Sequence, residues 1–205
     1  MVLSWGNHDY YKGSLMQVRA QVEDLVLDAP FLRYLSVSEV ISLSPEIALI
    51  GHDGWADGRY GDYARSRVML NDYVQIMELK GLDSTERLEM LNILGDQAAA
   101  FLQTQLDQAL VSHKQILLLT HVPPFKEACW HEDQLSSPEY LPHFSCKAVG
   151  DVLLEAMRKY PERQLTVLCG HTHSRGICQK LPNLWVLTGD AVYGKLLIQP
   201  PIVLG

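Results

Sequence analysis

The chain has 205 residues, of which 47% are hydrophobic and 20% are charged, so we expect one folded domain over residues 1–205 with a sizeable core. The formal net charge is −7 and no cluster of Lys and Arg occurs, which argues against nucleic acid or an anionic membrane as a partner. No apolar run approaches the roughly 18 residues that span a bilayer, the amino terminus shows no charged-then-apolar leader, and the cysteines form no CxxC pair, so we expect reduced thiols in a cytoplasmic protein.

Short apolar runs alternate with amphipathic stretches along the chain, which is typical of a domain that mixes strands and helices. The first helix is predicted to begin near Ser14, with Gln17 as its capping-box partner, and to end before Pro30. A longer helix is predicted to begin at Asp83, with Glu86 at the matching capping position. Its apolar stripe of leucines and alanines indicates one buried face.

A third helix is predicted from Val149 to Tyr160, because apolar residues recur at helical spacing there until Pro161 stops the pattern. Two stretches rich in Gly, Asp, Pro or aromatic residues, 53–66 and 123–145, are predicted to be loops over the sheet. The apolar runs between these segments predict strands at residues 2–4, 39–43, 47–50, 116–119, 165–168, 184–187 and 196–198.

Histidines and an asparagine follow three of the predicted strands, at the point where each strand ends. Asn7 and His8 follow the first strand, His121 follows the fourth, and His171 and His173 follow the fifth. Because strand ends converge on one edge of an open α/β sheet, where binding sites usually form, we expect these side chains to meet. Imidazole nitrogens with an amide oxygen suit borderline divalent ions such as zinc, manganese, iron or nickel, so the sequence predicts a transition-metal site.

The segments that carry these side chains are Gly-Asn-His-Asp at residues 6–9, Thr-His-Val-Pro-Pro at 120–124 and Cys-Gly-His-Thr-His at 169–173. In their order and intervals they resemble the third, fourth and fifth blocks of the calcineurin-like metallophosphoesterase family, and the match covers essentially the whole chain. The resemblance implies an α/β fold, the two-sheet αββα sandwich of that family, and metal-dependent hydrolysis of phosphate monoesters or diesters, a hydrolase or phosphatase activity.

The resemblance also implies a metal role for four residues. Asn7, His121 and His171 would bind one ion of a two-metal centre, and His173 would belong to the other ion. In such centres two ions about 3.5 to 4 Å apart hold the phosphoryl oxygens and acidify the attacking water.

Three more residues are assigned beside these ligands. By the resemblance, His8 would stabilise or protonate the leaving oxygen, and Asp9 would be the acidic neighbour that orients it. His52 ends another apolar run, and the segment from Gly51 to Trp55 either lines the substrate pocket or is a glycine-rich surface turn with Trp55 packed for structure. His52 is a candidate substrate-binding residue under the first alternative, and both alternatives stay open.

The family pattern opens with an Asp-x-His block and a Gly-Asp block, and neither has a counterpart in this sequence, which starts five residues before Gly6. We therefore expect an N-terminally truncated member that lacks the first strands of the sandwich. The Gly-Asp block would supply the carboxylate that bridges two ions, and without it two divalent ions 4 Å apart repel by about 16 kcal/mol at an effective dielectric of 20. One ion at Asn7, His121 and His171 and weak or lost catalysis are therefore expected. A start assigned too far downstream, a broken gene and a genuine loss remain open explanations.

The competing function is a non-catalytic remnant or scaffold that keeps one structural ion. A mononuclear zinc hydrolase of another class has the least support, because no His-Glu-x-x-His motif occurs. His131, His143 and Cys146 lie in the long loop after Pro124, which either covers the site or is plainly solvated. The expected partner is a phosphate-ester substrate, and the sequence specifies neither that substrate nor the oligomeric state.

Overall fold

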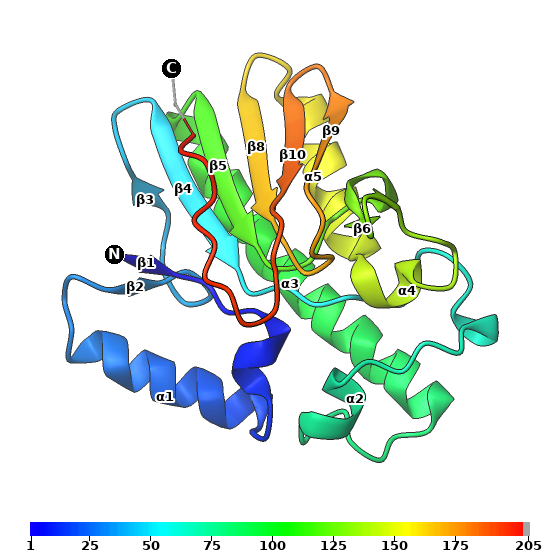
Figure 1. Ribbon diagram of the computed structural model, residues 1–205. Coiled ribbons are helices and arrows are strands. Elements are labelled where there is room, and N and C mark those ends of the chain that lie inside the picture. The colour runs from blue at the N-terminus through cyan, green and yellow to red at the C-terminus, as the bar shows by residue number, and fades with distance from the viewer. Residues whose placement is uncertain (203–205) are drawn as a thin grey trace.

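The structure, a computed structural model, describes residues 1–202 and is mixed α/β, as expected at the level of fold class. Its central sheet contains β3 (Ile41–Ser42), β4 (Ile47–His52), β5 (Gln115–Thr120), β8 (Gln164–Cys169), β9 (Gly176–Leu181) and β10 (Leu184–Thr188). The strand order is β3-β4-β5-β8-β10-β9 (Figure 1). The four inner strands are parallel, and the two edge strands run antiparallel to their neighbours. The carboxyl ends of β4, β5 and β8 therefore lie along one edge of the sheet.

Two short strand pairs lie outside this sheet. β1 (Val2–Leu3) pairs in parallel with β2 (Arg33–Tyr34), and β6 (Trp130–His131) pairs antiparallel with β7 (Gln134–Leu135). Each is a two-stranded sheet. Both pairs are much smaller than the second sheet of the sandwich that we expected.

The predicted strand at residues 196–198 is wrong. The segment contains no strand, and Leu196 and Ile198 are 96% and 91% exposed. An apolar run becomes a strand only where a neighbouring strand pairs with its backbone, and this segment has no such neighbour within residues 1–202. The other six predicted strands overlap β1, β3, β4, β5, β8 and β10, whereas β2, β6, β7 and β9 were not predicted.

The three predicted helices are present as α1 (Leu15–Leu27), α3 (Ser84–Ser112) and α5 (Lys147–Lys159). Their starts follow the expected capping, since the Ser14 hydroxyl accepts the N–H of Gln17, and Asp83 forms a capping box with Glu86. The predicted loops also contain short helical turns, which are η2 (Tyr63–Arg65), η3 (Lys126–Ala128) and α4 (Leu141–Phe144). Two further short helical turns, η1 (Asn7–Tyr10) and α2 (Asp72–Gln75), lie outside those loops.

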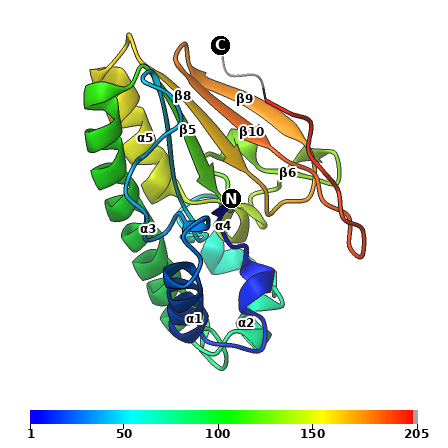
Figure 2. The same ribbon diagram turned by 90° about the vertical axis from the view of Figure 1, so that its left-hand side faces the viewer.

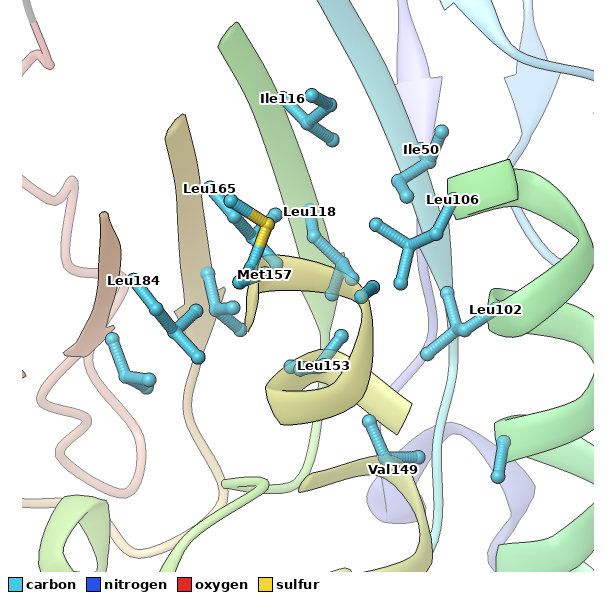
Figure 3. Packing of buried hydrophobic residues seen from close by; sticks show 14 of the residues in the cluster. Ile50, Leu102, Leu106, Ile116, Leu118, Val149, Leu153, Met157, Leu165 and Leu184 are labelled. Atoms are coloured by element: carbon cyan, nitrogen blue, oxygen red, sulfur yellow. The ribbon is translucent and has the colours of Figure 1, made fainter. Parts of the chain in front are cut away.

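The main core lies between the sheet and two helices, because α3 and α5 both cover the same face (Figure 2). Ile116 and Leu118 of β5 alternate with less buried residues, so their side chains point toward this layer. They pack with residues of the two helices, including Leu102 of α3 and Leu153 of α5 (Figure 3). Burying one such leucine stabilises the fold by about 2 kcal/mol, so the core holds the strand ends in fixed positions.

All four cysteines carry free thiols, and three of them are buried. None of the helices within residues 1–202 is long and apolar enough to cross a membrane.

Candidate metal centre

Three of the predicted ligands meet at the carboxyl edge of the sheet. His121 follows β5, His171 follows β8, and η1 brings Asn7 against both. The Nε2 atom of His121 lies 2.8 Å from Asn7 Oδ1 and 3.1 Å from His171 Nδ1. Two ligand atoms bound about 2.0 to 2.1 Å from one tetrahedral or octahedral ion lie about 2.8 to 3.4 Å apart. The spacing of His121 Nε2 from each of the other two donors therefore fits a single cation held by two imidazoles and an amide.

The hydrogen bonds of His171 fix which of its nitrogens carries a lone pair. Its Nε2 lies 3.0 Å from the carbonyl oxygen of His143 and must donate to it, so in the neutral ring Nδ1 carries no proton. Asn7 Oδ1 and His171 Nδ1 are then both acceptors directed at the one N–H of His121. A cation in place of that proton would meet three lone pairs, which is the donor set a borderline divalent ion prefers.

Burial favours the neutral form of both imidazoles. The pKa of His121 is held well below the ordinary value, first by burial and then by the neighbouring His171 and His8. Burial also lowers the pKa of His171, while Asp72 and the hydrogen bond to the His143 carbonyl partly oppose that shift. Neutral imidazole is the form that binds metal, so protons compete weakly for this site near neutral pH.

A buried carboxylate sets the orientation of the Asn7 amide. The Asn7 Nδ2 group donates to Asp72 Oδ1 at 2.7 Å, and the Tyr11 hydroxyl donates to the same oxygen at 2.8 Å. Asp72 is only 3% exposed. Because Nδ2 faces Asp72, Oδ1 must face His121, so this carboxylate acts as an outer-shell partner of the cluster. Asp72 was not predicted, because it lies in a polar stretch that no sequence motif connects to Asn7.

The backbone beside the cluster has conformations that only particular residues accept. A Cβ atom added at Gly6 would lie 2.7 Å from Cε1 of His121, so glycine is required where the chain passes the ring. His171 and His173 have φ angles of +68° and +67°, in the left-handed region that costs about 1 to 2 kcal/mol for residues with a side chain. Such strain concentrates at functional sites, and here it turns the chain back over the end of β8.

His8 and His173 lie beside the cluster but outside it. The His173 ring centroid is 6.1 Å from that of His8 and 4.9 Å from that of Tyr193, and His8 stacks on Tyr193 at 5.6 Å. Both histidines line a cavity that Asn7 and His171 also line. Within residues 1–202, no three His, Cys, Asp or Glu side chains are spaced to hold an ion, so the role of His173 in a second metal site stays a prediction.

Asp9 stabilises the turn to which it belongs. Its carboxylate accepts the N–H of Gly6 at 2.8 Å, which closes the turn of η1. Within the described part of the chain it makes no hydrogen bond to His8. Its predicted role in orienting His8 therefore stays a prediction.

The structure does not bring His52 to the cluster. Its ring lies under α3, 5.3 Å from Phe101, and its Nδ1 accepts the N–H of Gly54 at 2.9 Å. Burial lowers the pKa of His52 to about 4, and it lines none of the described cavities beside Asn7. Trp55 is buried, and it lines a small enclosed cavity together with Asn7, His121 and His171, so the role of the segment from Gly51 to Trp55 stays a prediction.

The next residue, Asp53, anchors the segment that carries Asn7. Its carboxylate is fully buried and accepts the Trp5 N–H at 2.7 Å and the Tyr10 hydroxyl at 2.6 Å. The Tyr34 hydroxyl donates to it as well. These bonds attach both ends of the Gly-Asn-His-Asp turn to the end of β4, although β1 lies outside the main sheet.

The loop at residues 123–145 borders the site. His131 lines the cavity beside His171, whereas His143 is buried and contacts Tyr73 and Ser66. Burial lowers the pKa of His143 to about 4, and Cys146 lies in the main core. Of the two alternatives for this loop, the structure agrees with the one in which it covers part of the site.

No protein-family model matches the chain, and no curated protein sequence matches it. Among solved structures, a dimetal phosphatase from Danio rerio is 17% identical with a TM-score of 0.49, over 91% of this chain and 59% of that one. A proposed 5′-nucleotidase from Staphylococcus aureus is 11% identical with a TM-score of 0.46, over 92% of this chain and 32% of that one. The chain thus spans less than two thirds of either protein.

Proposed function

We propose that this protein is a divalent-metal-dependent phosphoesterase, with Asn7, His121 and His171 as the ligands of one ion. The observation that carries the proposal is the convergence of their donor atoms, at 2.8 and 3.1 Å, from three distant parts of the chain. The three motifs that contain them resemble metallophosphoesterase blocks in the same order. On this proposal the six-stranded sheet with α3 and α5 is one half of an αββα sandwich.

On this proposal, different residues of the chain have different roles in ester hydrolysis. When bound, a divalent ion would supply Lewis acidity, drawing electron density from the phosphoryl oxygens. Asn7 would hold its oxygen toward the ion because Asp72 holds its nitrogen. As water bonds to phosphorus it would release a proton to the solvent. As the ester P–O bond breaks, the leaving oxygen would take a proton from His8, which is exposed and lines the same cavity as His171.

A specific observation also favours the second candidate, a non-catalytic metal-binding scaffold. The cluster includes no carboxylate, and the ring of His173 contacts Tyr193 and His8 rather than the other ligands. Three neutral donors of this kind can hold one ion without a second ion beside it. The two candidates differ in turnover and not in metal binding.

The test measures metal binding and turnover separately. The protein is stripped with a chelator, reloaded with Mn²⁺, Zn²⁺ or Ni²⁺, and assayed with 4-nitrophenyl phosphate and bis(4-nitrophenyl) phosphate. The phosphoesterase proposal expects metal-dependent turnover that His121→Ala abolishes together with metal binding. His8→Ala should abolish turnover and leave metal binding intact.

His113→Ala is the matched control, because this histidine lies at the opposite edge of the sheet and, within residues 1–202, its ring hydrogen-bonds to Ser42 and Ser112. It should change neither metal binding nor turnover. Metal binding without turnover in the unaltered protein would support the scaffold instead. Unchanged metal binding in both His121→Ala and His171→Ala would contradict both candidates.

A further inference from the structure

The cavity beside the metal cluster has a volume of about 270 Å³ and one wall made of packed rings. His131, Tyr140 and Phe144 lie with ring centroids 5.2 to 5.5 Å apart. The Phe144 ring is also 5.4 Å from the ring of His171. This wall therefore extends from the proposed ligand His171 through Phe144 to His131 and Tyr140.

A second set of rings faces the same cavity from other parts of the chain. Tyr193, in the segment after β10, stacks on His8 with an interplanar angle of 14°, and His8 lies 4.7 Å from the Tyr11 ring. All three line the cavity. The segment that carries Tyr193 runs on the side of the sheet opposite α3 and α5 (Figures 1 and 2). Rings from three distant segments thus surround one space.

The charge of the lining restricts the ligand further. Among the described residues, no Lys or Arg lines this cavity, and the one carboxylate among them, Asp72, already accepts two hydrogen bonds. A chain of several phosphoryl groups would find no cationic side chain here to pair with its charge. A neutral planar group in this cavity would find aromatic side chains among the lining residues to pack against.

We infer that this cavity binds a phosphate ester with a single phosphoryl group and a planar aromatic ring close to the ester oxygen. The ring packs against the Tyr140 and Phe144 wall on one side and Tyr193 on the other. The inference rests on the proposed function only for the phosphoryl end, because the rings and their spacing are independent of any ion. Stacking on such rings favours a planar ligand over a puckered one of equal size by about tenfold.

The experiment compares benzyl phosphate with cyclohexylmethyl phosphate. Both esters release a primary alcohol with a methylene between ring and oxygen, so their bond-breaking chemistry is similar, and they differ in whether the six-membered ring is planar and aromatic or puckered and saturated. We expect kcat/KM to be about tenfold higher for benzyl phosphate. Tyr193→Leu should remove most of this preference, and, because Tyr193 is 72% exposed, the fold should not change.

Phe31→Leu is the matched control, because this aromatic residue is also 72% exposed but lies after α1 and lines none of the described cavities. It should leave the preference unchanged. Equal kcat/KM values for the two esters in the unaltered protein would overturn the inference and leave the phosphoesterase proposal standing.

Binding supplies a second readout that needs no turnover. Isothermal titration with benzylphosphonate and cyclohexylmethylphosphonate should show about tenfold tighter binding of the planar compound, again reduced by Tyr193→Leu. If neither ester is hydrolysed but benzylphosphonate still binds more tightly, the cavity assignment stands and the phosphoesterase proposal fails. Equal affinities, or no binding of benzylphosphonate at millimolar concentration, would overturn the inference.

Discussion

Replacing Asp72 by Asn keeps the shape of the side chain and removes its charge, so it tests whether this carboxylate positions Asn7 for a metal ion. Asp72 Oδ1 accepts one bond from Asn7 and one from Tyr11, whose hydroxyl is itself 3.5 Å from Asn7 Nδ2. A hydrogen bond to a charged acceptor is stronger than a neutral one by about 1 kcal/mol. The variant weakens both bonds, by about 2 kcal/mol in all for the network that holds Asp72 against the Asn7 amide, which corresponds to roughly 30-fold in affinity. This falls within the 10- to 100-fold range typical of outer-shell partners.

The assay is a competition for Zn²⁺ between the protein and a colorimetric chelator at pH 7.5. Asp57→Asn is the matched control, because Asp57 is also a buried aspartate but accepts bonds from Arg59 and Ala148, away from the cluster. We expect Asp57→Asn to lower the free energy of unfolding without changing zinc affinity. A zinc affinity for Asp72→Asn within threefold of the unaltered protein would refute the reasoning.

Three further predictions concern the fold around the site. Gly6→Ala should weaken zinc binding at least tenfold in the same competition assay, because the added Cβ meets the His121 ring at 2.7 Å, and unchanged affinity would contradict the close approach. The pKa of His52 is about 4 in the folded protein and about 6.5 when unfolded, so the unfolded state binds more protons between these values and stability falls as pH drops below 6.5. In His52→Asn the side-chain oxygen can still accept the Gly54 N–H. When the pH is lowered from 7 to 5, the free energy of unfolding measured in urea titrations should fall by about 2 kcal/mol less in this variant than in the unaltered protein. An identical pH dependence of the two proteins would contradict this. Leu102→Ala removes a fully buried side chain of α3 and should lower the unfolding free energy by about 2 to 5 kcal/mol, whereas a change below 1 kcal/mol would mean that the core relaxes around it.

Short sequence patterns predicted those parts of the fold that depend on residues close together in the sequence. The start of α3 follows from Asp83 and Glu86, whose reciprocal hydrogen bonds involve residues three positions apart. The convergence of His121 and His171 follows from strand ends, because parallel strands in register place their carboxyl ends on one edge. Asn7 belongs to the same cluster, although its segment is attached to that edge by the buried Asp53 rather than by pairing in the main sheet.

Features that depend on distant partners were missed. The edge strand β9 places only Cys178 among the buried core residues, so its sequence shows little apolar periodicity, and its pairing with β10 defines it. Asp72 and Tyr193 carry no motif, and their roles arise only when the fold brings them beside Asn7 and His8. In a single sequence, nothing distinguishes Asp72 and Tyr193 from ordinary loop residues.

The most direct test is anomalous diffraction from crystals of the protein grown with Mn²⁺ or Zn²⁺, recorded at the absorption edge of the metal. We expect a single strong peak about 2.0 to 2.2 Å from Asn7 Oδ1, His121 Nε2 and His171 Nδ1 together. A peak bound to only one of these atoms, or a strong peak elsewhere with none at the cluster, would contradict it.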